Sequence, residues 1–283
     1  MHEVETSIIT CGGEMPAFVA APRTNAKSNA KSNAKSNAKS NAKPPVVIVM
    51  HERYGLVRHT RDVAVRFARD GYLAIAPDFF FKHPDQDALH RGDSSYEMSD
   101  DEAVARLTAT VDTLASISGA DGGRIAVMGV CQTGRHPLVL AASRPIAAAL
   151  VWYGAAQPRE WAVNNKYPRP LEDIIAAVGC PVLGMFGETD HLISIGDVRR
   201  FRDCLERHGR SFRIHVYRDA PHGWLNDTMP GRYRPTQAQA AWSVQSAFLK
   251  RALAPECDRS IITQHYEADI AANYDFSRNV RLE

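Results

Sequence analysis

The chain has 283 residues, of which 45% are hydrophobic and 23% are charged, as is usual for a soluble globular protein with a sizeable core. Its formal net charge of +2 includes five lysines from one repetitive tract. Without them, 29 basic residues face 32 acidic ones, a net charge of −3. The composition therefore excludes a basic surface that would bind nucleic acid.

The five cysteines are widely scattered and show neither C-x-x-C spacing nor histidine partners at metal-ligand intervals. They are Cys11, Cys131, Cys180, Cys204 and Cys257. This pattern indicates a reducing compartment and no structural zinc. The N-terminal residues include acids, and no apolar run approaches the ~18 residues of a membrane span. We therefore expect no signal peptide, no membrane segment and a cytoplasmic location.

The first part of the chain predicts a hairpin followed by an insertion. Residues 6–10 and 15–20 are short strand-like runs on either side of a Gly-Gly turn, which favours an antiparallel pair at the start of a sheet. The triplet Asn-Ala-Lys then recurs five times up to Lys43. This tract is too poor in apolar residues to offset its ordering entropy, so we expect a mobile loop insertion at 24–44.

Beyond the insertion, apolar runs alternate with segments of helical spacing. The runs predict strands at 46–50, 72–76, 124–128, 147–153, 181–186 and 212–217. The helical segments are 60–69, 99–118, one that begins near 134, 171–178, 196–208 and 236–252. Ser99 and Glu102 form a capping box for the second helix. The fold class is α/β, a mostly parallel eight-stranded sheet with helices on both faces and ligands at the carboxyl ends of its strands.

The segment Gly129-Val-Cys-Gln-Thr-Gly134 follows the strand at 124–128 and predicts a sharp turn into a helix. Cys131 would sit on this turn, where a helix N-terminus favours both a thiolate and an oxyanion. This segment alone leaves open the alternative that Cys131 is an unreactive core thiol.

Two further candidates follow other strands at the same edge of the sheet. Asp190 comes after the seventh predicted strand and His222 after the eighth. Taken singly, Asp190 could cap the next helix and His222 could be an ordinary loop histidine. The order nucleophile, acid, base is the one that α/β-hydrolases use, so the joint placement favours a triad with Cys131. Three other titratable residues fit less well by position: His136, Glu188 and His215.

These segments resemble the dienelactone hydrolase family of the α/β-hydrolase fold, whose members carry cysteine in place of serine at the elbow. The resemblance extends from the hairpin to about Leu253. It rests on His51-Glu-Arg-Tyr-Gly55, Gly71-Tyr-Leu-Ala-Ile-Ala-Pro-Asp78, Gly129-Val-Cys-Gln-Thr-Gly134, Val151-Trp-Tyr-Gly154, Gly187-Glu-Thr-Asp190 and Ala220-Pro-His-Gly223. It implies an α/β-hydrolase domain with Cys131 as nucleophile, His222 as base and Asp190 as the group that orients the base.

The resemblance also assigns Glu52 to a family glutamate that helps to form the thiolate when substrate arrives; a hydrogen bond within its own turn is the alternative. Thr133 departs from the family pattern because glycine usually occupies its place, and its Cβ should crowd the turn unless neighbours compensate. Members that cleave dienelactone have an arginine shortly after the histidine, to hold the substrate carboxylate, whereas Trp224-Leu-Asn226 follows here. Arg53, Arg91 or Arg135 would have to supply that cation, and Tyr54 and Trp224 either line an apolar pocket or simply pack.

The predicted reaction is attack of the Cys131 thiolate on a small ester or enol lactone. The backbone N–H of Gln132 and one from the turn at Glu52 and Arg53 would hold the oxyanion. A general carboxylesterase or thioesterase for small acyl groups would use the same triad, and a non-catalytic binding module of this fold is a further alternative. The chain has no Walker sequence and no G-x-G-x-x-G motif, so we expect no cofactor and no metal.

We expect a single hydrolase domain at 1–253 and a C-terminal extension at 254–283. The extension contains Tyr266, Tyr274 and Phe276 but is too polar to form a core of its own. Its pattern fits packing on the same domain and packing on a second subunit of a homodimer equally well.

Overall fold

The computed structural model describes residues 1–22, 43–116 and 120–283. Of the predicted insertion at 24–44, all but residues 43 and 44 lie outside the described residues. Among the described residues, no helix combines the length and the apolar character needed to cross a membrane.

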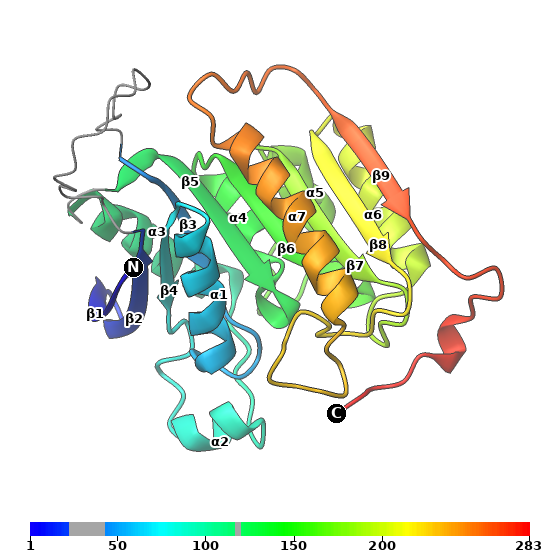
Figure 1. Ribbon diagram of the computed structural model, residues 1–283, viewed down its shortest axis with the longest axis horizontal. Helices are drawn as coiled ribbons and strands as arrows, with labels where there is room; N and C mark the ends of the chain where they lie inside the picture. Colours follow the sequence, from blue (N-terminus) through cyan, green and yellow to red (C-terminus); the bar gives the residue numbers. More distant parts are fainter. Residues whose placement is uncertain (23–42, 117–119) are drawn as a thin grey trace, which may run out of the picture.

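A nine-stranded sheet forms the centre of the molecule, in the order β1-β2-β4-β3-β5-β6-β7-β8-β9 (Figure 1). The strands are β1 (His2–Thr10), β2 (Gly13–Ala21), β3 (Pro45–Val49), β4 (Leu73–Pro77), β5 (Asp121–Val130), β6 (Ala148–Trp152), β7 (Val182–Gly187), β8 (Phe212–Tyr217) and β9 (Gln264–Ala268). β1 pairs antiparallel with β2, and β2 pairs antiparallel with β4. All neighbours from β4 to β9 are parallel, which confirms the α/β class. The antiparallel pair of β1 and β2 confirms the predicted hairpin.

Helices cover both faces of this sheet, as the sequence predicts (Figure 1). One layer contains α1 (Arg58–Arg69) and α7 (Pro235–Ala252), and the other contains α3 (Asp100–Ser116), α4 (His136–Ser143), α5 (Leu171–Ala177) and α6 (Ile195–Arg207). In β3, Val46 and Ile48 pack toward the larger layer, whereas Val47 and Val49 pack toward α1 and α7. Because both faces are buried, the strand is a continuous aliphatic run and not an alternating one.

The start of α3 follows a local signal in the sequence. At the start of α3, Ser99 Oγ accepts the N–H of Glu102 at 3.2 Å, and the Glu102 carboxylate accepts the N–H of Ser99 at 3.0 Å, which confirms the predicted capping box. In the stretch before it the sequence predicts no helix, but the structure contains the short helix α2 (Gln86–Arg91). Asp85 caps α2 by accepting the N–H of Ala88. A six-residue helix has too few turns to show a helical period.

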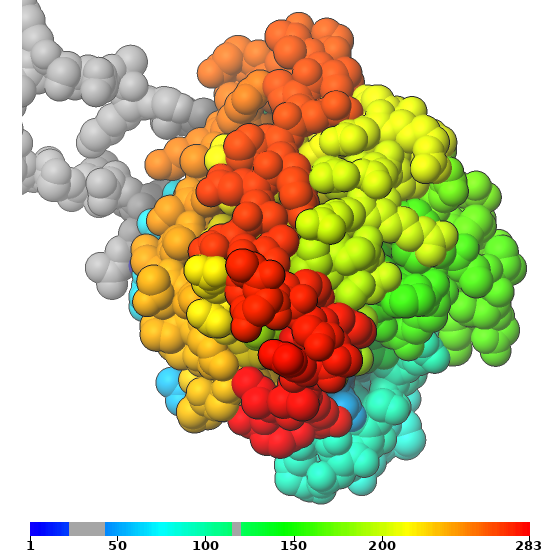
Figure 2. Space-filling model, turned by 90° about the vertical axis from the view of Figure 1, so that its right-hand side faces the viewer, coloured from blue at the N-terminus to red at the C-terminus, as the bar shows by residue number. Residues whose placement is uncertain are grey.

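The expectation of eight strands is wrong by one, because the C-terminal extension contributes β9 to the edge of the sheet. The side chains of β9 are mostly exposed, so its sequence lacks the apolar alternation of a half-buried strand. Residues 269–283, with η3 (Phe276–Arg278), then continue over the surface of the domain (Figure 2). Tyr266 and Tyr274 are half-buried against the core. The extension therefore packs on its own domain.

We expect Ile48→Ala, in the centre of the sheet, to lower the free energy of unfolding by about 2–5 kcal/mol, because the side chain is fully buried and its loss leaves a cavity. Ile9→Ala removes the same atoms from a side chain that is 70% exposed, so this control should change stability by only about 0.5 kcal/mol. Urea-induced unfolding measures both. Similar losses for the two variants would contradict the assigned core.

Candidate active site

The end of β5 turns sharply at Cys131, the first residue of η1 (Cys131–Thr133). Cys131 has φ 55°, a left-handed backbone conformation that costs a non-glycine residue roughly 1–2 kcal/mol. Two glycines make this turn sterically feasible. A Cβ on Gly129 would collide with the carbonyl oxygen of Thr133, and one on Gly154 would collide with that of Cys131. Close packing therefore fixes the cysteine in a strained position at the carboxyl edge of the sheet.

Thr133 is accommodated because the hydrogen bonds of its hydroxyl group compensate for the crowding by its Cβ. Its Oγ1 accepts the backbone N–H of Val130 at 3.0 Å and lies 2.9 Å from the carbonyl oxygen of His51, to which it donates. The side chain is fully buried. The crowding that the sequence predicts is thus compensated, and the threonine ties the elbow to the loop that follows β3.

The structure brings Cys131, His222 and Asp190 together from loops that follow β5, β8 and β7. His222 Nε2 lies 2.9 Å from Cys131 Sγ, and His222 Nδ1 lies 2.8 Å from Asp190 Oδ2. The second carboxylate oxygen of Asp190 accepts the backbone N–H groups of Leu192 and Ile193. Both polar side chains are buried, whereas Cys131 is partly exposed. A proton can therefore pass between sulfur and imidazole at a place that a ligand can reach.

Burial of His222 opposes the charged imidazolium and by itself would lower its pKa. The carboxylate of Asp190 and the sulfur of Cys131 outweigh this effect, so the pKa of His222 lies well above its usual value. The site thus favours a protonated imidazole beside the cysteine, which is the arrangement that a reactive thiol needs.

Glu52 lies in the loop after β3, and its carboxylate is held by two neighbours. Tyr153 donates its hydroxyl to Oε1 at 3.2 Å, and Asn226 donates its amide to Oε2 at 2.6 Å. Burial and the adjacent Glu52 carboxylate raise the pKa of Tyr153 well above its usual value, so this phenol remains a donor. The hydrogen bonds of Glu52 therefore reach beyond its own turn.

A cavity of about 210 Å³ opens beside the cysteine. Its lining consists of Glu52, Arg53, Tyr54, Cys131, His191, Leu192, His222, Arg232 and Arg281. The sequence predicted five of these residues. It missed His191, Leu192, Arg232 and Arg281. His191 and Leu192 directly follow Asp190, so their position in the sequence is a signal that could have found them. No local pattern connects Arg281 with the loop that carries Asp190, which lies about ninety residues earlier in the chain.

The structure places three candidate substrate-binding residues away from this cavity: the predictions for Arg91 and Arg135 need correction, and Trp224 follows the packing alternative. Arg91 is on α2 and pairs with Asp93 at 2.9 Å on the surface. Arg135 is fully buried, and its guanidinium is bound by the carboxylates of Asp100 and Glu160. Trp224 is also fully buried and packs against other aromatic rings. None of these side chains lines the cavity, because sequence position does not reveal to which side of a loop or helix a side chain points.

The competing titratable residues Glu188 and His136 lie in other environments. Glu188 accepts backbone N–H groups of Asp219 and Ala271. His136 is buried in α4, and burial lowers its pKa to about 3. The N-terminus of α6 is capped by Ser194 and not by Asp190, which leaves the Asp190 carboxylate facing the imidazole. Gln132, proposed from the sequence for its backbone N–H, uses its side chain to donate to the Tyr96 carbonyl at 2.6 Å.

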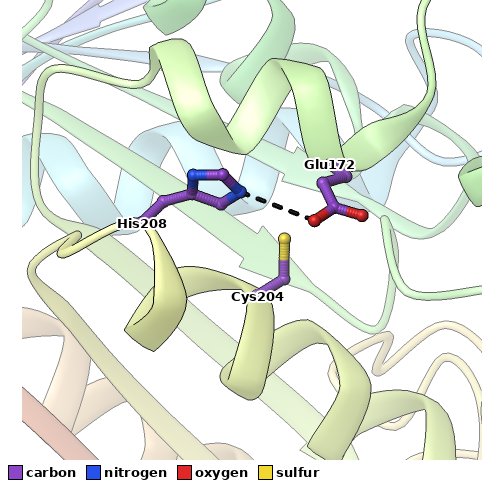
Figure 3. A group of neighbouring side chains, drawn as sticks. All are labelled: Glu172, Cys204 and His208. Atoms are coloured by element: carbon purple, nitrogen blue, oxygen red, sulfur yellow. Dashed lines mark ion pairs between the residues drawn. The ribbon is translucent and has the colours of Figure 1, made fainter.

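Two groups of side chains in the described residues place potential metal ligands close together, and neither shares a residue with the cavity. Glu172, Cys204 and His208 point toward one another from α5 and the end of α6 (Figure 3). Arg207 already donates to the Glu172 carboxylate at 2.6 Å, and burial raises the pKa of Cys204 to about 11. In this first group, an ion pair therefore links α5 to α6, and the thiol of Cys204 is protonated.

The second group consists of His215, His265 and Glu267 on β8 and β9. Arg213 donates to His215 Nε2 at 2.8 Å, and Glu267 lies 3.4 Å from the other ring nitrogen of His215. These contacts engage the side chains that a metal would need, and burial lowers the pKa of His215 to about 4.

Comparison with known proteins decides the family. The profile described as "Dienelactone hydrolase family" matches residues 33–253. The chain belongs to the dienelactone hydrolase family. A candidate carboxymethylenebutenolidase of Salmonella typhimurium is 33% identical over 244 residues, which cover 84% of this chain and 83% of the relative.

Two further comparisons agree with membership of the dienelactone hydrolase family. A candidate 2-oxo-3-(5-oxofuran-2-ylidene)propanoate lactonase of Bradyrhizobium sp is 27% identical over 73% of this chain and 83% of its own length. The crystal structure of a candidate dienelactone hydrolase from Klebsiella pneumoniae has a TM-score of 0.72 and 29% identity, and covers 88% of this chain and 98% of that one. The fold is therefore the α/β-hydrolase fold, as the resemblance implies.

We expect Thr133→Val to lower the free energy of unfolding by about 1–3 kcal/mol, because the buried N–H of Val130 loses its acceptor while the side-chain volume is kept. Thr133→Ser retains the hydroxyl group and serves as the control. Equilibrium unfolding in urea measures the difference. A valine variant as stable as the wild type would show that the hydroxyl does not compensate for the Cβ.

Asp190→Asn should lower the pKa of His222, because the carboxylate that offsets the effect of burial is removed. Titration of the imidazole signals by NMR measures this shift. Glu188→Gln is a matched control, since Glu188 follows the same strand but bonds to backbone groups. An unchanged His222 titration in Asp190→Asn would disprove the electrostatic role of this carboxylate.

Proposed function

We propose that this protein hydrolyses small esters or enol lactones through a Cys131 nucleophile and an acyl-enzyme intermediate. Membership of the dienelactone hydrolase family makes the chain a hydrolase of the dienelactone hydrolase type. The observation that supports the finer proposal most strongly is the continuous line of contacts from Cys131 Sγ through His222 to Asp190 beside a cavity. Sulfur, imidazole and carboxylate in this order form the catalytic arrangement of nucleophile, base and orienting group.

In the first half of the reaction, the thiol proton is on His222 Nε2 and the thiolate attacks the carbonyl carbon of the substrate. A carbon–sulfur bond forms, and the carbonyl electron pair moves onto oxygen. The backbone N–H groups of Gln132 and of the turn at Arg53 are the proposed donors to this oxyanion. When the tetrahedral intermediate collapses, the bond to the leaving oxygen breaks, and that oxygen takes the proton from His222.

In the second half, His222 removes a proton from water, which attacks the thioester carbonyl. The carbon–sulfur bond then breaks, and a carboxylic acid leaves. Asp190 keeps the imidazole in the orientation that both proton transfers need, since it accepts from Nδ1 at 2.8 Å. Glu52 lines the same cavity, and the family resemblance assigns to it a part in forming the thiolate when substrate arrives.

The substrate class follows from the chemistry of the nucleophile. A thioester intermediate forms readily from activated esters and enol lactones, whose leaving oxygen needs little assistance, and less readily from amides. The lactonase name of the Bradyrhizobium relative supports lactones for this chain. Small acyl thioesters would fit the same geometry, and a panel of enol lactones and acyl thioesters compared by kcat/KM separates the two classes. The contact between sulfur and imidazole argues against a non-catalytic binding module.

We expect Cys131→Ala to reduce kcat for 4-nitrophenyl acetate by about 10³-fold or more, because the acyl acceptor is lost. Cys11→Ala is the control, since this exposed cysteine lies in the turn between β1 and β2. Release of 4-nitrophenolate, corrected for spontaneous hydrolysis, is the measurement. Hydrolysis by Cys131→Ala at the wild-type rate would remove Cys131 from the mechanism.

A further inference from the structure

The strand β9 leaves one edge of the central sheet open. It pairs with β8 on one side, and among the described residues no strand pairs with its other side (Figure 1). The C-terminal extension, with β9, lies on the surface of one face of the molecule (Figure 2). The strand contains no proline and no lysine, and its register with β8 runs through five residue pairs without a bulge. Because these devices commonly protect a free edge, an edge that lacks them is suited to pairing with another strand.

The backbone groups of β9 alternate between β8 and the open edge. The carbonyl oxygen of Thr263 accepts the N–H of Phe212, and the N–H of Asp269 donates to the carbonyl oxygen of Val216. Odd-numbered residues of β9 therefore direct their backbone groups toward β8, and even-numbered residues direct theirs outward. The outward N–H and C=O groups belong to Gln264, Tyr266 and Ala268. In the described part of the chain, no loop or side chain forms hydrogen bonds with these groups.

A second, antiparallel copy of β9 would satisfy these backbone groups. Twofold symmetry about Tyr266 sets this residue opposite Tyr266 of the second copy, and Gln264 opposite Ala268. Both are hydrogen-bonded pairs, because both members direct their N–H and C=O groups to the open edge. His265 then lies opposite Glu267 of the second copy, in the non-hydrogen-bonded type of pair that brings side chains closest.

The polar side chains of β9 favour this register over its neighbours. His265 and Glu267 have side chains that are 50% and 65% exposed. The contacts of Glu267 with His215 and His265 of its own chain use Oε2, so Oε1 remains available among the described residues. An imidazole can donate to a carboxylate in both of its protonation states. Twofold symmetry about His265 or Glu267 would instead set two identical polar side chains opposite each other, which for the carboxylates is repulsive.

Exposed apolar side chains gather in the same part of the chain. The described residues include eight large hydrophobic side chains that are exposed, and four of them lie in the extension: Ile261, Ile262, Phe276 and Val280. Continued beyond the ends of β9, the register about Tyr266 sets Ile262 opposite Ile270 of the second copy. Ile262 is 52% exposed and Ile270 is half-buried, so this contact would remove apolar surface from water.

We propose that the open edge of β9 is the interface of a twofold symmetric homodimer, in which two nine-stranded sheets join edge to edge. The partner is a second copy of this chain, because the backbone groups, the pair of His265 with Glu267 and the pair of Ile262 with Ile270 are all self-complementary. A twofold interface requires the same patch to match itself in this way. The proposal is independent of the reaction, since none of these residues lines the active-site cavity.

The first test measures the dissociation constant of the dimer by sedimentation equilibrium. The wild-type chain should reach twice its mass of 31.3 kDa as its concentration rises. Glu267→Arg and His265→Glu should each raise the dissociation constant about tenfold, because two symmetric pairs then set like charges opposite each other. The double variant His265→Glu/Glu267→Arg exchanges acid and base, so it should return the constant close to the wild-type value.

Glu3→Arg is the matched control for net charge, because it makes the same change on β1 at the opposite edge of the sheet. It should leave the dissociation constant unchanged. Rescue by the double variant depends on His265 and Glu267 being opposite each other across the interface, which a general effect of surface charge would not require.

A second test removes a backbone donor and keeps the strand. Ala268→Pro deletes an outward N–H that makes no bond with β8, so it should abolish the dimer. Ala268→Ser retains the N–H and should form the dimer like the wild type. Urea unfolding of the monomeric Ala268→Pro variant checks that its fold is intact.

Three results would overturn the proposed interface. They are a wild-type chain that stays monomeric at all concentrations, an assembly that grows beyond two chains, and a dimer that Ala268→Pro and both single charge variants leave unchanged.

Discussion

The left-handed backbone at Cys131 is the constraint on which the rest of the site depends. A cysteine gains nothing intrinsically from this conformation, so packing must maintain it. Gly129 and Gly154 leave the space that the turn needs, and Thr133 ties it to the neighbouring loop. The result is a sulfur atom that projects from the sheet edge toward His222. If this turn relaxed to an ordinary helical conformation, the sulfur would leave the imidazole, and the other two members of the proposed triad would have no nucleophile.

The support beneath this turn is electrostatic as well as steric. Arg135 follows the elbow directly and is fully buried, with Asp100 accepting two of its hydrogen bonds and Glu160 a third. A buried ion pair of this kind often contributes little net stability, but breaking it by removing one partner is costly. It therefore links the start of α4 to the start of α3 and to the loop after β6. Arg135 is close to Cys131 in the sequence, as the prediction assumed. Its side chain, however, forms ion pairs in the interior and does not line the cavity.

The sequence predicted the central sheet because parallel strands buried on both faces are continuous aliphatic runs, as in β3, and because turn residues follow each run. It also predicted which loops meet, since strands of known order place their carboxyl ends at one edge. It missed β9 and α2 because an exposed edge strand and a six-residue helix carry almost no hydrophobic period. It missed Arg281 for a different reason: the path of a polar extension depends on side-chain and backbone hydrogen bonds, such as those of Asn279, that no local pattern records.

The central claim is that Cys131 carries the acyl group during turnover. The most direct measurement is acid quenching of the wild-type protein during hydrolysis of 4-nitrophenyl acetate, followed by peptide mass spectrometry of all five cysteines. The account predicts an acetyl group on the peptide that contains Cys131, formed within the first turnover and lost as substrate is consumed. An acetyl group that forms and turns over at this rate on another residue would contradict it.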